Sequence, residues 1–558
     1  MPDASHTGGA FADRALPVEC IRTPEEFSDE QKQIRAMTQE FVENEILPVS
    51  DRIEKVEPGL MRSLVEKAGD LGLLGVEIAE PYGGMGLGTT TAAIVAEAVG
   101  PQASYSISQS VQTGIGSLPI VYFGTAAQKE KYLPLLATGK KFACYALTEP
   151  SSGTDALAAK CKATLNPDGK TYTLNGTKMW ITNAGFSDVY VVFAKIDGEK
   201  FSAFIIDRDT PGFSVAPEEK KLGLKGSSTC ALNLKNAQVP ADHVLGEIGK
   251  GHKIAFNILN VGRFKLGSSA VGAAKYALRC ALGYAHERHQ FGKPIATFGA
   301  IQHKLAQMAV NCYVGESMIF ATAGLIDRAA ALPHAGVPDE EARLAAIEEH
   351  AVECSIMKVG ATEILDYVAD EAVQIYGGYG YSAEYPVERI YRDSRINRIF
   401  EGTNEINRII IPTRLIRAAG KGELPHLAEA LKNPWAGVEQ IERASSAEGR
   451  GAQAGRALAG GRAIVQLVCG LGQAKFGKEF ADQQEILCGV ADLCIALYGA
   501  DVAFVRSTKA WKNADPNAEI MGLLAKVALQ EAMQKFRTGL EELLPALVSP
   551  EQLPSAIE

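Results

Sequence analysis

The feature that most constrains the fold is a repeated change in the spacing of apolar residues along the chain. At 558 residues the chain exceeds what one hydrophobic core usually organises, so several packed units are expected. The spacing divides it into a helical unit, a strand-rich unit and two further helical units, at residues 23–139, 140–250, 251–417 and 418–558. The fold class is therefore expected to be α+β.

The strand-rich unit is recognised by its turn dipeptides. Asp168-Gly169, Asn175-Gly176 and Asp197-Gly198 each separate runs of β-branched and aromatic residues. Such dipeptides favour the backbone conformations of tight hairpins. The pattern predicts a compact antiparallel β domain placed between helical parts.

The helical units carry their own start and stop signals. Ser28 and Gln31 have the spacing of a capping box, which predicts a helix start, and the glycine cluster at 375–381 interrupts a long helical pattern. An Ala/Gly-rich stretch at 445–461 precedes the last apolar-periodic segments. We interpret that stretch as a flexible connection to an additional helical domain.

Composition excludes several classes of function. The net charge of −10 argues against nucleic acid as a partner, because binding to phosphates requires a basic surface. Ten cysteines without a C-x-x-C pair, and a start that lacks a charged leader followed by an apolar core, predict a reducing interior such as a bacterial cytoplasm and no signal peptide. Apolar stretches such as 463–471 are too short for a transmembrane segment.

Two motifs lie in the strand-rich unit. The loop 145–155, YALTEPSSGTD, can present backbone N–H groups and hydroxyls to an anionic or carbonyl-rich ligand, although an ordinary loop explains it equally simply. In 179–184, MWITNA, Trp180 and Thr182 fall on one face of a strand, where the indole could stack on a planar ring and the hydroxyl could bond its edge. The alternative is that both belong to the core.

Two more motifs follow in the second helical unit. Arg288, within HERHQFGK, suits a diphosphate because its planar guanidinium pairs with two phosphate oxygens. The neighbouring His286 and His289 lack further ligands at metal spacing, so no metal site is expected. The glycines of 374–380 would let backbone approach a ligand, but they do not form a dinucleotide fingerprint.

The last motif, 398–408, contains a candidate general base. Glu401 follows Ile399 and Phe400, which would exclude water from its carboxylate, raise its pKa and make it a stronger base. The competing interpretation is a glutamate at a helix start, satisfying the helix dipole.

In order and separation these motifs resemble those of the acyl-CoA dehydrogenase family, from about residue 23 to residue 417. The stretches that carry the resemblance are YALTEPSSGTDA, KMWITNAG, ERHQFGKPI, QIYGGYGYSAEYPVERIYRD and RIFEGTNEI. The resemblance implies an N-terminal helical domain, a middle β domain and a second helical bundle that hold FAD. Some cofactor contacts in this family come from a neighbouring subunit, so at least a homodimer is implied.

The resemblance also assigns roles to residues. Those implied to contact the flavin ring or the rest of FAD are Leu147, Thr148, Thr154, Trp180, Thr182, Arg288, Phe291, Gln302, Gln374, Gly378 and Thr403. Glu401 is implied to be the catalytic base and Gly402 to lie beside the cofactor, and Gly402 and Arg263 are implied to bind the substrate. Some members place the base just before that arginine, but Gly262 occupies this position and cannot act. Glu405, one turn after Glu401, is the natural control.

The implied reaction is α,β-desaturation of a fatty acyl-CoA to the trans-2-enoyl-CoA, a step of fatty acid β-oxidation. A base in a desolvated pocket removes the α-proton while the charge on the thioester oxygen is stabilised. A hydride from the β-carbon goes to the flavin, and the family's usual electron acceptor is electron-transfer flavoprotein. An acyl-CoA oxidase would share the fold and base, and a non-catalytic assembly or scaffold relative is a rival from another class.

The additional C-terminal unit most resembles the very-long-chain branch of the family. Ser106 and Ser110 lie one helical turn apart, and such small residues could deepen a tunnel for a long acyl tail or simply pack against another helix. Charged residues near the Ala/Gly-rich stretch are nearly balanced: Arg443, Arg450, Arg456, Arg462, Glu439, Glu442 and Glu448. We expect a solvated linker there, with weak peripheral membrane contact as the alternative.

Overall fold

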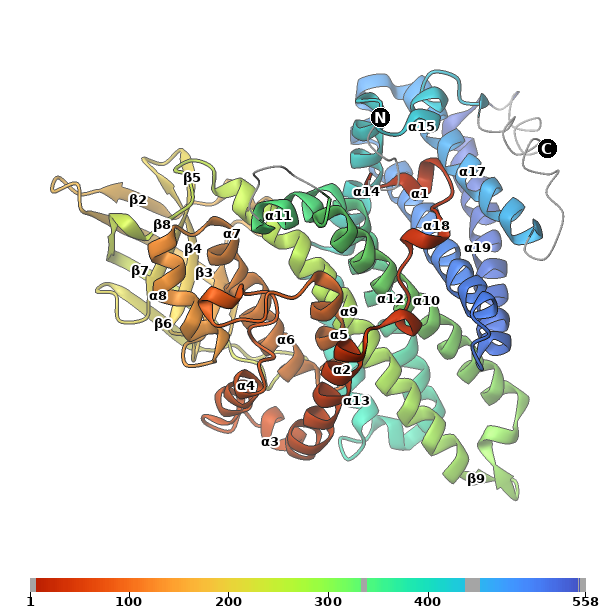
Figure 1. The fold of residues 1–558 in the computed structure, drawn as a ribbon, viewed down its shortest axis with the longest axis horizontal. Coiled ribbons are helices and arrows are strands. Elements are labelled where there is room, and N and C mark those ends of the chain that lie inside the picture. The colour runs from red at the N-terminus through yellow and green to blue at the C-terminus, as the bar shows by residue number, and fades with distance from the viewer. Residues whose placement is uncertain (1–6, 333–338, 437–451, 550, 552–558) are drawn as a thin grey trace.

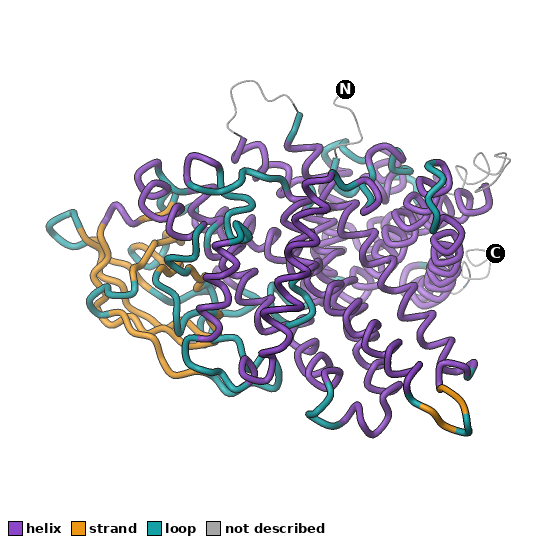
Figure 2. The backbone as a smooth tube through the Cα atoms, turned by 60° about the horizontal axis from the view of Figure 1, so that its bottom comes forward, coloured by secondary structure: helices purple, strands orange, loops and turns teal. Residues whose placement is uncertain are grey.

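The computed structural model describes residues 7–332, 339–436, 452–549 and 551. Figure 1 shows a sheet at one end of an elongated molecule and helices at the other end, where the first helix lies beside the last ones; most of the other red to orange helices lie between the two ends or beside the sheet. The strands lie together in a second view as well, with a small hairpin at the opposite end (Figure 2).

Short helices form the first part of the chain. They are α1 (Ala10–Asp13), α2 (Asp29–Phe41), α3 (Ser50–Glu54), α4 (Leu60–Asp70), α5 (Thr89–Ala98), α6 (Ala103–Val111), α7 (Leu118–Phe123) and α8 (Ala126–Ala137). The predicted capping box is confirmed: Ser28 Oγ accepts from the N–H of Gln31, and the Gln31 side chain accepts from the N–H of Ser28.

The sheet follows these helices. Its strands are β1 (Ala143–Ala146), β2 (Lys162–Leu165), β3 (Thr171–Thr182), β4 (Val189–Ile196), β5 (Lys200–Asp207), β6 (Phe213–Glu218), β7 (Thr229–Pro240) and β8 (Val244–Leu245). The strand order is β6-β7-β3-β2-β4-β5-β8, and β1 pairs with β4. Most pairs are antiparallel as predicted, but β4 pairs in parallel with both β1 and β2, so the purely antiparallel expectation is wrong.

Two of the three predicted hairpin turns are present. Asp168-Gly169 lies between β2 and β3, and Asp197-Gly198 joins β4 to β5 with both residues at positive φ. Asn175-Gly176 is instead inside β3, where the pairing with β7 shifts register between Leu174 and Gly176. This register shift is a bulge, and its position requires glycine because a Cβ on Gly176 would lie 2.1 Å from Cys161 Sγ.

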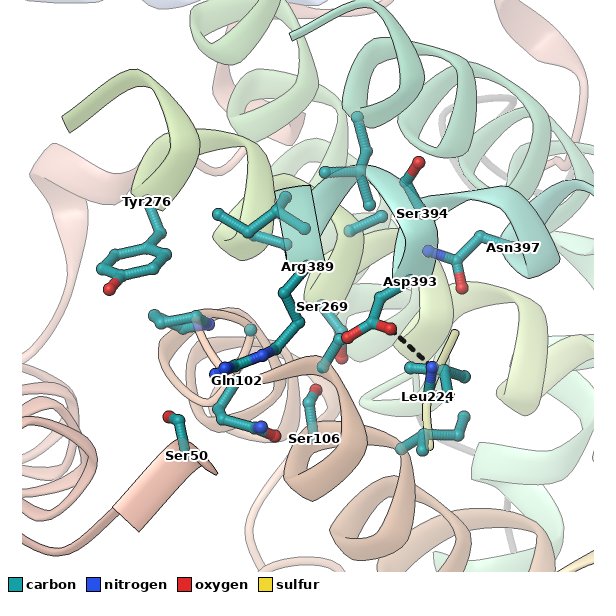
Figure 3. Close-up of a pocket in the computed structure, with 18 of the residues that line it drawn as sticks. Ser50, Gln102, Ser106, Leu224, Ser269, Tyr276, Arg389, Asp393, Ser394 and Asn397 are labelled. Carbon is teal, nitrogen blue, oxygen red and sulfur yellow. Dashed lines mark hydrogen bonds between the residues drawn. The ribbon is translucent and has the colours of Figure 1, made fainter. Parts of the chain in front are cut away.

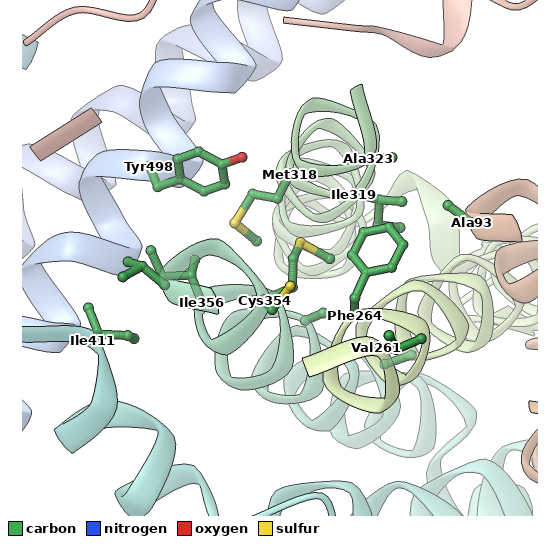
Figure 4. Packing of buried hydrophobic residues seen from close by; sticks show 14 of the residues in the cluster. Ala93, Val261, Phe264, Met318, Ile319, Ala323, Cys354, Ile356, Ile411 and Tyr498 are labelled. Carbon is green, nitrogen blue, oxygen red and sulfur yellow. The ribbon is translucent and has the colours of Figure 1, made fainter. Parts of the chain in front are cut away.

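Long helices make up the second helical part. They are α9 (Gly251–Glu287), α10 (Gly299–Ala330), α11 (Asp339–Glu349), α12 (Ala351–Tyr376), α13 (Pro386–Ser394) and α14 (Asn404–Gly420). The hairpin of β9 (His289–Gln290) and β10 (Lys293–Pro294) links α9 to α10. Figure 4 shows side chains of these helices meeting in one apolar core, with Phe264 from α9, Met318 from α10 and Ile356 from α12.

The last helices share that core. They are α15 (Pro425–Ala430), α17 (Ala452–Phe476), α18 (Gln484–Lys512) and α19 (Ala518–Leu547). Tyr498 of α18 is fully buried and its hydroxyl bonds that of Thr322 in α10 at 2.8 Å. The additional domain is therefore packed against the rest of the molecule through its own apolar faces.

The prediction of a flexible connection at 445–461 is wrong for residues 452–461. From Ala452 onward the chain is helix α17, and Gly461 lies against the ring of Phe536 so closely that a Cβ would meet it at 2.5 Å. Arg462, expected on a solvated surface, is buried and pairs with buried Asp501. Small residues here allow helices to approach closely, which composition alone does not distinguish from a linker. Arg443, Arg450, Glu439, Glu442 and Glu448 lie outside the described residues.

The N-terminal segment closes over the additional domain. Phe11 is fully buried, and its carbonyl accepts from Arg462 Nε at 2.9 Å. The side chain of Gln466 donates to the carbonyls of Ala12 and Asp13, whose carboxylate accepts from the N–H of Leu427 at 2.9 Å. The first and last parts of the chain are thus joined by hydrogen bonds.

Two helices are long and apolar enough to cross a membrane, although the apolar stretches of the sequence were expected to be too short for this. They are Gly299–Ala330 and Gln484–Lys512, and 83% and 72% of their most apolar windows are buried inside the molecule. Their apolar faces are used by the core, as in the central helices of water-soluble proteins.

Candidate active site

Two helices provide facing stripes of side chains that line a cavity of about 240 Å³. Helix α9 contributes Gly262, Lys265, Leu266, Ser269, Ala270, Ala273 and Tyr276, and helix α6 with the residue before it contributes Gln102, Ala103, Ser106, Ile107, Ser110 and Val111. Both sets recur every three or four residues, as one helix face must. Figure 3 shows Gln102, Ser106, Ser269, Tyr276 and Arg389 around this cavity.

Glu401 lines the cavity at the Gly262 end. It lies between a 3-10 turn (Arg395–Arg398) and α14, with φ of 58° at Glu401 and 80° at Gly402. A left-handed conformation is costly for a glutamate and persists only where surrounding contacts impose it. Arg263 Nε donates to the carbonyl of Glu401 at 3.1 Å, and the Asn407 side chain donates to the carbonyl of Gly402 at 2.9 Å.

The Glu401 carboxyl is desolvated. Its Oε2 is buried and has no hydrogen-bond partner in the described part of the chain. Burial raises the pKa of Glu401 to about 7, while the nearby charges of Arg263 and Lys358 limit the rise. The interpretation as a helix-start glutamate is wrong, because α14 begins at Asn404 and its cap is Thr403, whose Oγ1 accepts from the N–H of Ile406. Glu405 lies within α14 and is exposed.

A buried lysine, Lys358, contacts the start of α14 next to Glu401, and it was not among the residues predicted from the sequence. Lys358 of α12 is fully buried, and its Nζ donates to Oδ1 of Asn404 at 2.6 Å. Burial lowers the pKa of Lys358 to about 7, whereas the negative charge of Glu401 raises it. A lysine inside the apolar run CSIMKVG was the available signal, since an unpaired lysine is rarely buried.

The residues predicted to contact the flavin ring come together on the sheet, where the segment after β1 runs beside β3. Leu147 and Thr148 follow β1, and the carbonyl of Thr148 accepts from the N–H of Met179 in β3. Trp180 is 54% exposed with φ of 62°, at a bulge between Lys178 and Ile181. The carbonyl of Leu147 also accepts from buried Lys178 at 3.0 Å, so these two segments are held in register. Thr182 is partly buried in the same strand, and Thr154 is exposed in the loop.

The residues predicted for the remainder of FAD lie at the other end of the molecule. Arg288 and Gly378 line one hollow together with Gln290, Gly377 and the aromatic rings of Tyr284, Tyr376 and Tyr379. Phe291 is 94% exposed at the tip of the β9–β10 hairpin, and Gln302 and Gln374 are exposed on α10 and α12. Figures 1 and 2 place this hairpin far from the sheet, so one chain does not bring the two sets together.

The hollow has the donors that a diphosphate requires. Arg288 lines the hollow with its guanidinium 5.3 Å from the ring centre of Tyr379, and a guanidinium can pair with two phosphate oxygens. A Cβ on Gly377 or Gly378 would meet no atom within 4 Å, so backbone is open to a ligand there. The described residues contain no group of three metal-ligating side chains.

Four family models match the chain in succession. Their descriptions are acyl-CoA dehydrogenase N-terminal domain at residues 28–140, middle domain at 144–237, and two C-terminal domain models at 249–416 and 461–554. Together they match both the three-part body and the additional unit.

Individual relatives agree with these models. The chain is 45% identical over 543 residues to a probable acyl-CoA dehydrogenase of Bacillus subtilis, covering 97% of this chain and 91% of the relative. It is 35% identical to the mitochondrial very long-chain specific acyl-CoA dehydrogenase of Bos taurus, covering 96% and 83%. A crystal structure of an acyl-CoA dehydrogenase complexed with FAD from Bacillus anthracis superposes with a TM-score of 0.95 at 46% identity, covering 99% and 94%.

Proposed function

The chain belongs to the acyl-CoA dehydrogenase family of FAD-dependent oxidoreductases, and from this premise we propose that it desaturates long-chain fatty acyl-CoA thioesters with Glu401 as the base. The observation that carries the proposal is the Glu401 carboxyl, whose buried Oε2 has no partner among the described residues and lines a long, mostly apolar cavity.

Glu401 has the properties that removal of an α-proton requires. Its pKa of about 7 makes the carboxylate a stronger base than an exposed glutamate while leaving it largely ionised at slightly alkaline pH. Arg263 and Asn407 hold the segment by its backbone carbonyls, so the carboxyl itself stays free to accept a proton. A fixed position matters because misplacement of a catalytic group by about 1 Å can cost on the order of 100-fold in rate.

The residues on the sheet suit one half of FAD, and those near the β9–β10 hairpin suit the other half. Thr148, Trp180 and Thr182 would hold the flavin ring, and Arg288, Phe291, Gln302, Gln374 and Gly378 would hold the diphosphate and adenosine part. When bound, FAD supplies the hydride acceptor of the reaction. Because one chain holds the two halves far apart, we propose a homodimer in which each site takes its second half from the partner subunit.

The cavity supports a long acyl chain. Its lining on α9 runs from Gly262 to Tyr276, and 14 residues of helix advance about 21 Å. An extended alkyl chain advances about 1.25 Å per carbon, given carbon–carbon bonds of about 1.5 Å. We therefore propose acyl chains of roughly 14 to 18 carbons as substrates.

Family membership also supports a proposal for the electron acceptor and the cellular compartment. We propose electron-transfer flavoprotein as the acceptor and a reducing interior as the compartment, which suits ten cysteines that are all free thiols.

An anaerobic titration tests the proposal. The purified flavoprotein is mixed with saturated acyl-CoAs of 4 to about 22 carbons, and loss of oxidised flavin absorbance is followed, with the optimum expected at about 14 to 18 carbons. Glu401→Gln should retain FAD and bind acyl-CoA but bleach at least about 100-fold more slowly, whereas Glu405→Gln should behave like the wild type. Bleaching of Glu401→Gln at the wild-type rate would contradict the assignment, and rapid peroxide release in air would indicate an oxidase.

A further inference from the structure

The distal half of the cavity, which is the part farther from Glu401, is lined by more polar groups than an unsubstituted alkyl chain requires. Ser106 and Ser269 face it from α6 and α9, and Gln102, the residue that caps α6, lies one turn before Ser106. Figure 3 shows all three side chains around the same space, next to Arg389. An apolar ligand would leave their polar groups without water.

Three of these polar atoms are buried without a partner in the part of the chain that the structure describes. They are Ser106 Oγ, Ser269 Oγ and Gln102 Nε2. The whole of Ser106 is 2% exposed and Gln102 is 3% exposed. Oε1 of Gln102 is already occupied, because it accepts from the N–H of Tyr105 at 2.8 Å. Leaving such groups unsatisfied against an alkyl tail is unfavourable, so they match a ligand that carries an oxygen at this depth.

We propose that this site binds long acyl chains that carry a hydroxyl group in their distal half, and that Ser106 and Ser269 form its hydrogen bonds. The inference rests on the proposed function, because it assumes that the acyl chain enters at Glu401. Ser269 lies seven residues after Gly262 on α9, about 10 Å along the helix axis, which corresponds to roughly eight carbons beyond the reacting α-carbon. The hydroxyl is therefore expected near the tenth to twelfth carbon, by the same estimate.

A neutral hydroxyl fits better here than a carboxylate. Among the described residues that line the cavity, Arg389 and Lys265 are the cations, and both are already paired: Arg389 with Asp51 at 2.5 Å, and Lys265 with Glu77. Asp393 also lines the cavity, and burial raises its pKa to about 7, so part of this acid is ionised near neutral pH. A second negative charge would be repelled by these acids, whereas a hydroxyl both donates and accepts.

The test compares octadecanoyl-CoA with 12-hydroxyoctadecanoyl-CoA on the purified flavoprotein, by kcat/KM. The wild type should use the hydroxylated chain at least as well as the plain one. The Ser106→Ala/Ser269→Ala double variant should lower the ratio of hydroxylated to plain kcat/KM about tenfold, the size of one or two neutral hydrogen bonds. Ser104→Ala is the matched control. Ser104 Oγ on α6 is also buried without a hydrogen-bond partner among the described residues, but Ser104 does not line the cavity, so the ratio should not change.

The outcomes separate the two proposals. Turnover of octadecanoyl-CoA tests the dehydrogenase function alone, and its absence refutes that function first. If the plain chain is used normally but the ratio is the same in wild type, double variant and control, the hydroxyl site is refuted. If the double variant does not fold, a wild-type kcat/KM for the hydroxylated chain more than about tenfold below the plain chain refutes it equally.

Discussion

A methyl group on Gly262 would lie 2.5 Å from Oε2 of Glu401. The glycine on α9 therefore leaves the room that the carboxylate occupies. Gly262→Ala should leave the fold stable, because alanine is favoured over glycine inside a helix by about 1 kcal/mol. It should push the carboxylate aside and lower kcat by roughly 10- to 100-fold. The melting temperature checks the predicted stability, and the rate of flavin reduction checks the predicted loss of activity. An unchanged kcat would contradict the close approach of Gly262 to the Glu401 carboxylate.

The activity should depend on the ionisation of Glu401. Its pKa is about 7 in the free protein, and only the carboxylate can accept the α-proton. We expect kcat/KM to rise with pH through about 7 and to level off above it. A pH profile with a substrate that does not itself titrate in this range measures the midpoint. A midpoint near 4.5, the ordinary value for glutamate, would show that the carboxyl is not desolvated in solution.

Lys358 should influence the pH midpoint of the kcat/KM profile, because its charge lowers the pKa of Glu401. Its positive charge favours the ionised form of Glu401, and its Nζ also fixes Asn404 at the start of α14. Lys358→Met removes the charge, so the midpoint of the kcat/KM profile should move to higher pH. Lys358→Arg keeps the charge and should move it less. If the methionine variant loses activity with an unmoved midpoint, the role of Lys358 is confined to holding Asn404 in place.

Phe291 should be needed for cofactor retention. It is 94% exposed at a hairpin tip, and among the described aromatic rings it contacts only that of Phe298, with ring centres 6.0 Å apart, so most of its surface is open to a bound cofactor. Phe291→Ala should lower the ratio of flavin to protein and the temperature at which FAD is released. Leu282→Ala is a control. Leu282 is another exposed apolar residue, 45% exposed, but it lies on α9 and not at the hairpin tip. Equal flavin content in wild type and Phe291→Ala, measured after gel filtration, would contradict the proposed site.

The buried pair of Arg462 and Asp501 should stabilise the additional helices. Arg462→Met leaves the Asp501 carboxylate buried without its partner, which typically costs about 3 to 5 kcal/mol. Arg537→Met breaks an exposed pair with Glu541 on α19 and should cost about 0.5 kcal/mol or less. Urea unfolding followed by circular dichroism compares the two variants, and similar midpoints would contradict the buried pairing.

Much of the architecture was predictable, because helices and strands impose different spacings on apolar residues. The capping box at Ser28 and two hairpin turns were identified from local chemistry alone. Asn175-Gly176 was misinterpreted because glycine serves a bulge inside a long strand as well as a turn, and here Gly176 has φ of 151° at a register shift in β3. The parallel pairing of β1 with β4 joins strands more than 40 residues apart, and no local signal encodes such a contact.

The candidate site was predictable where one motif carries it. The apolar neighbours of Glu401 made it a candidate base beside the helix-start alternative, and the family resemblance assigned it that role. Glu401, Ser106 and Ser110 do line the cavity. Lys358, Gln102 and Ser269 were missed, because their proximity to the cavity depends on how α6, α9 and α12 pack. A helical projection of α9 from Gly262 would have found Ser269, which lies on the same face seven residues later.

The hydrogen bond from Arg462 to the Phe11 carbonyl joins residues 451 positions apart. During synthesis at roughly 5 to 20 residues per second, the N-terminal segment must wait on the order of 20 to 90 seconds before α17 exists. The ring of Phe11 also packs 5.0 Å from that of Tyr498 in α18, so its apolar site is complete only after α18 has been made. An N-terminal affinity tag would therefore interfere with the final docking of the protein rather than with its early folding.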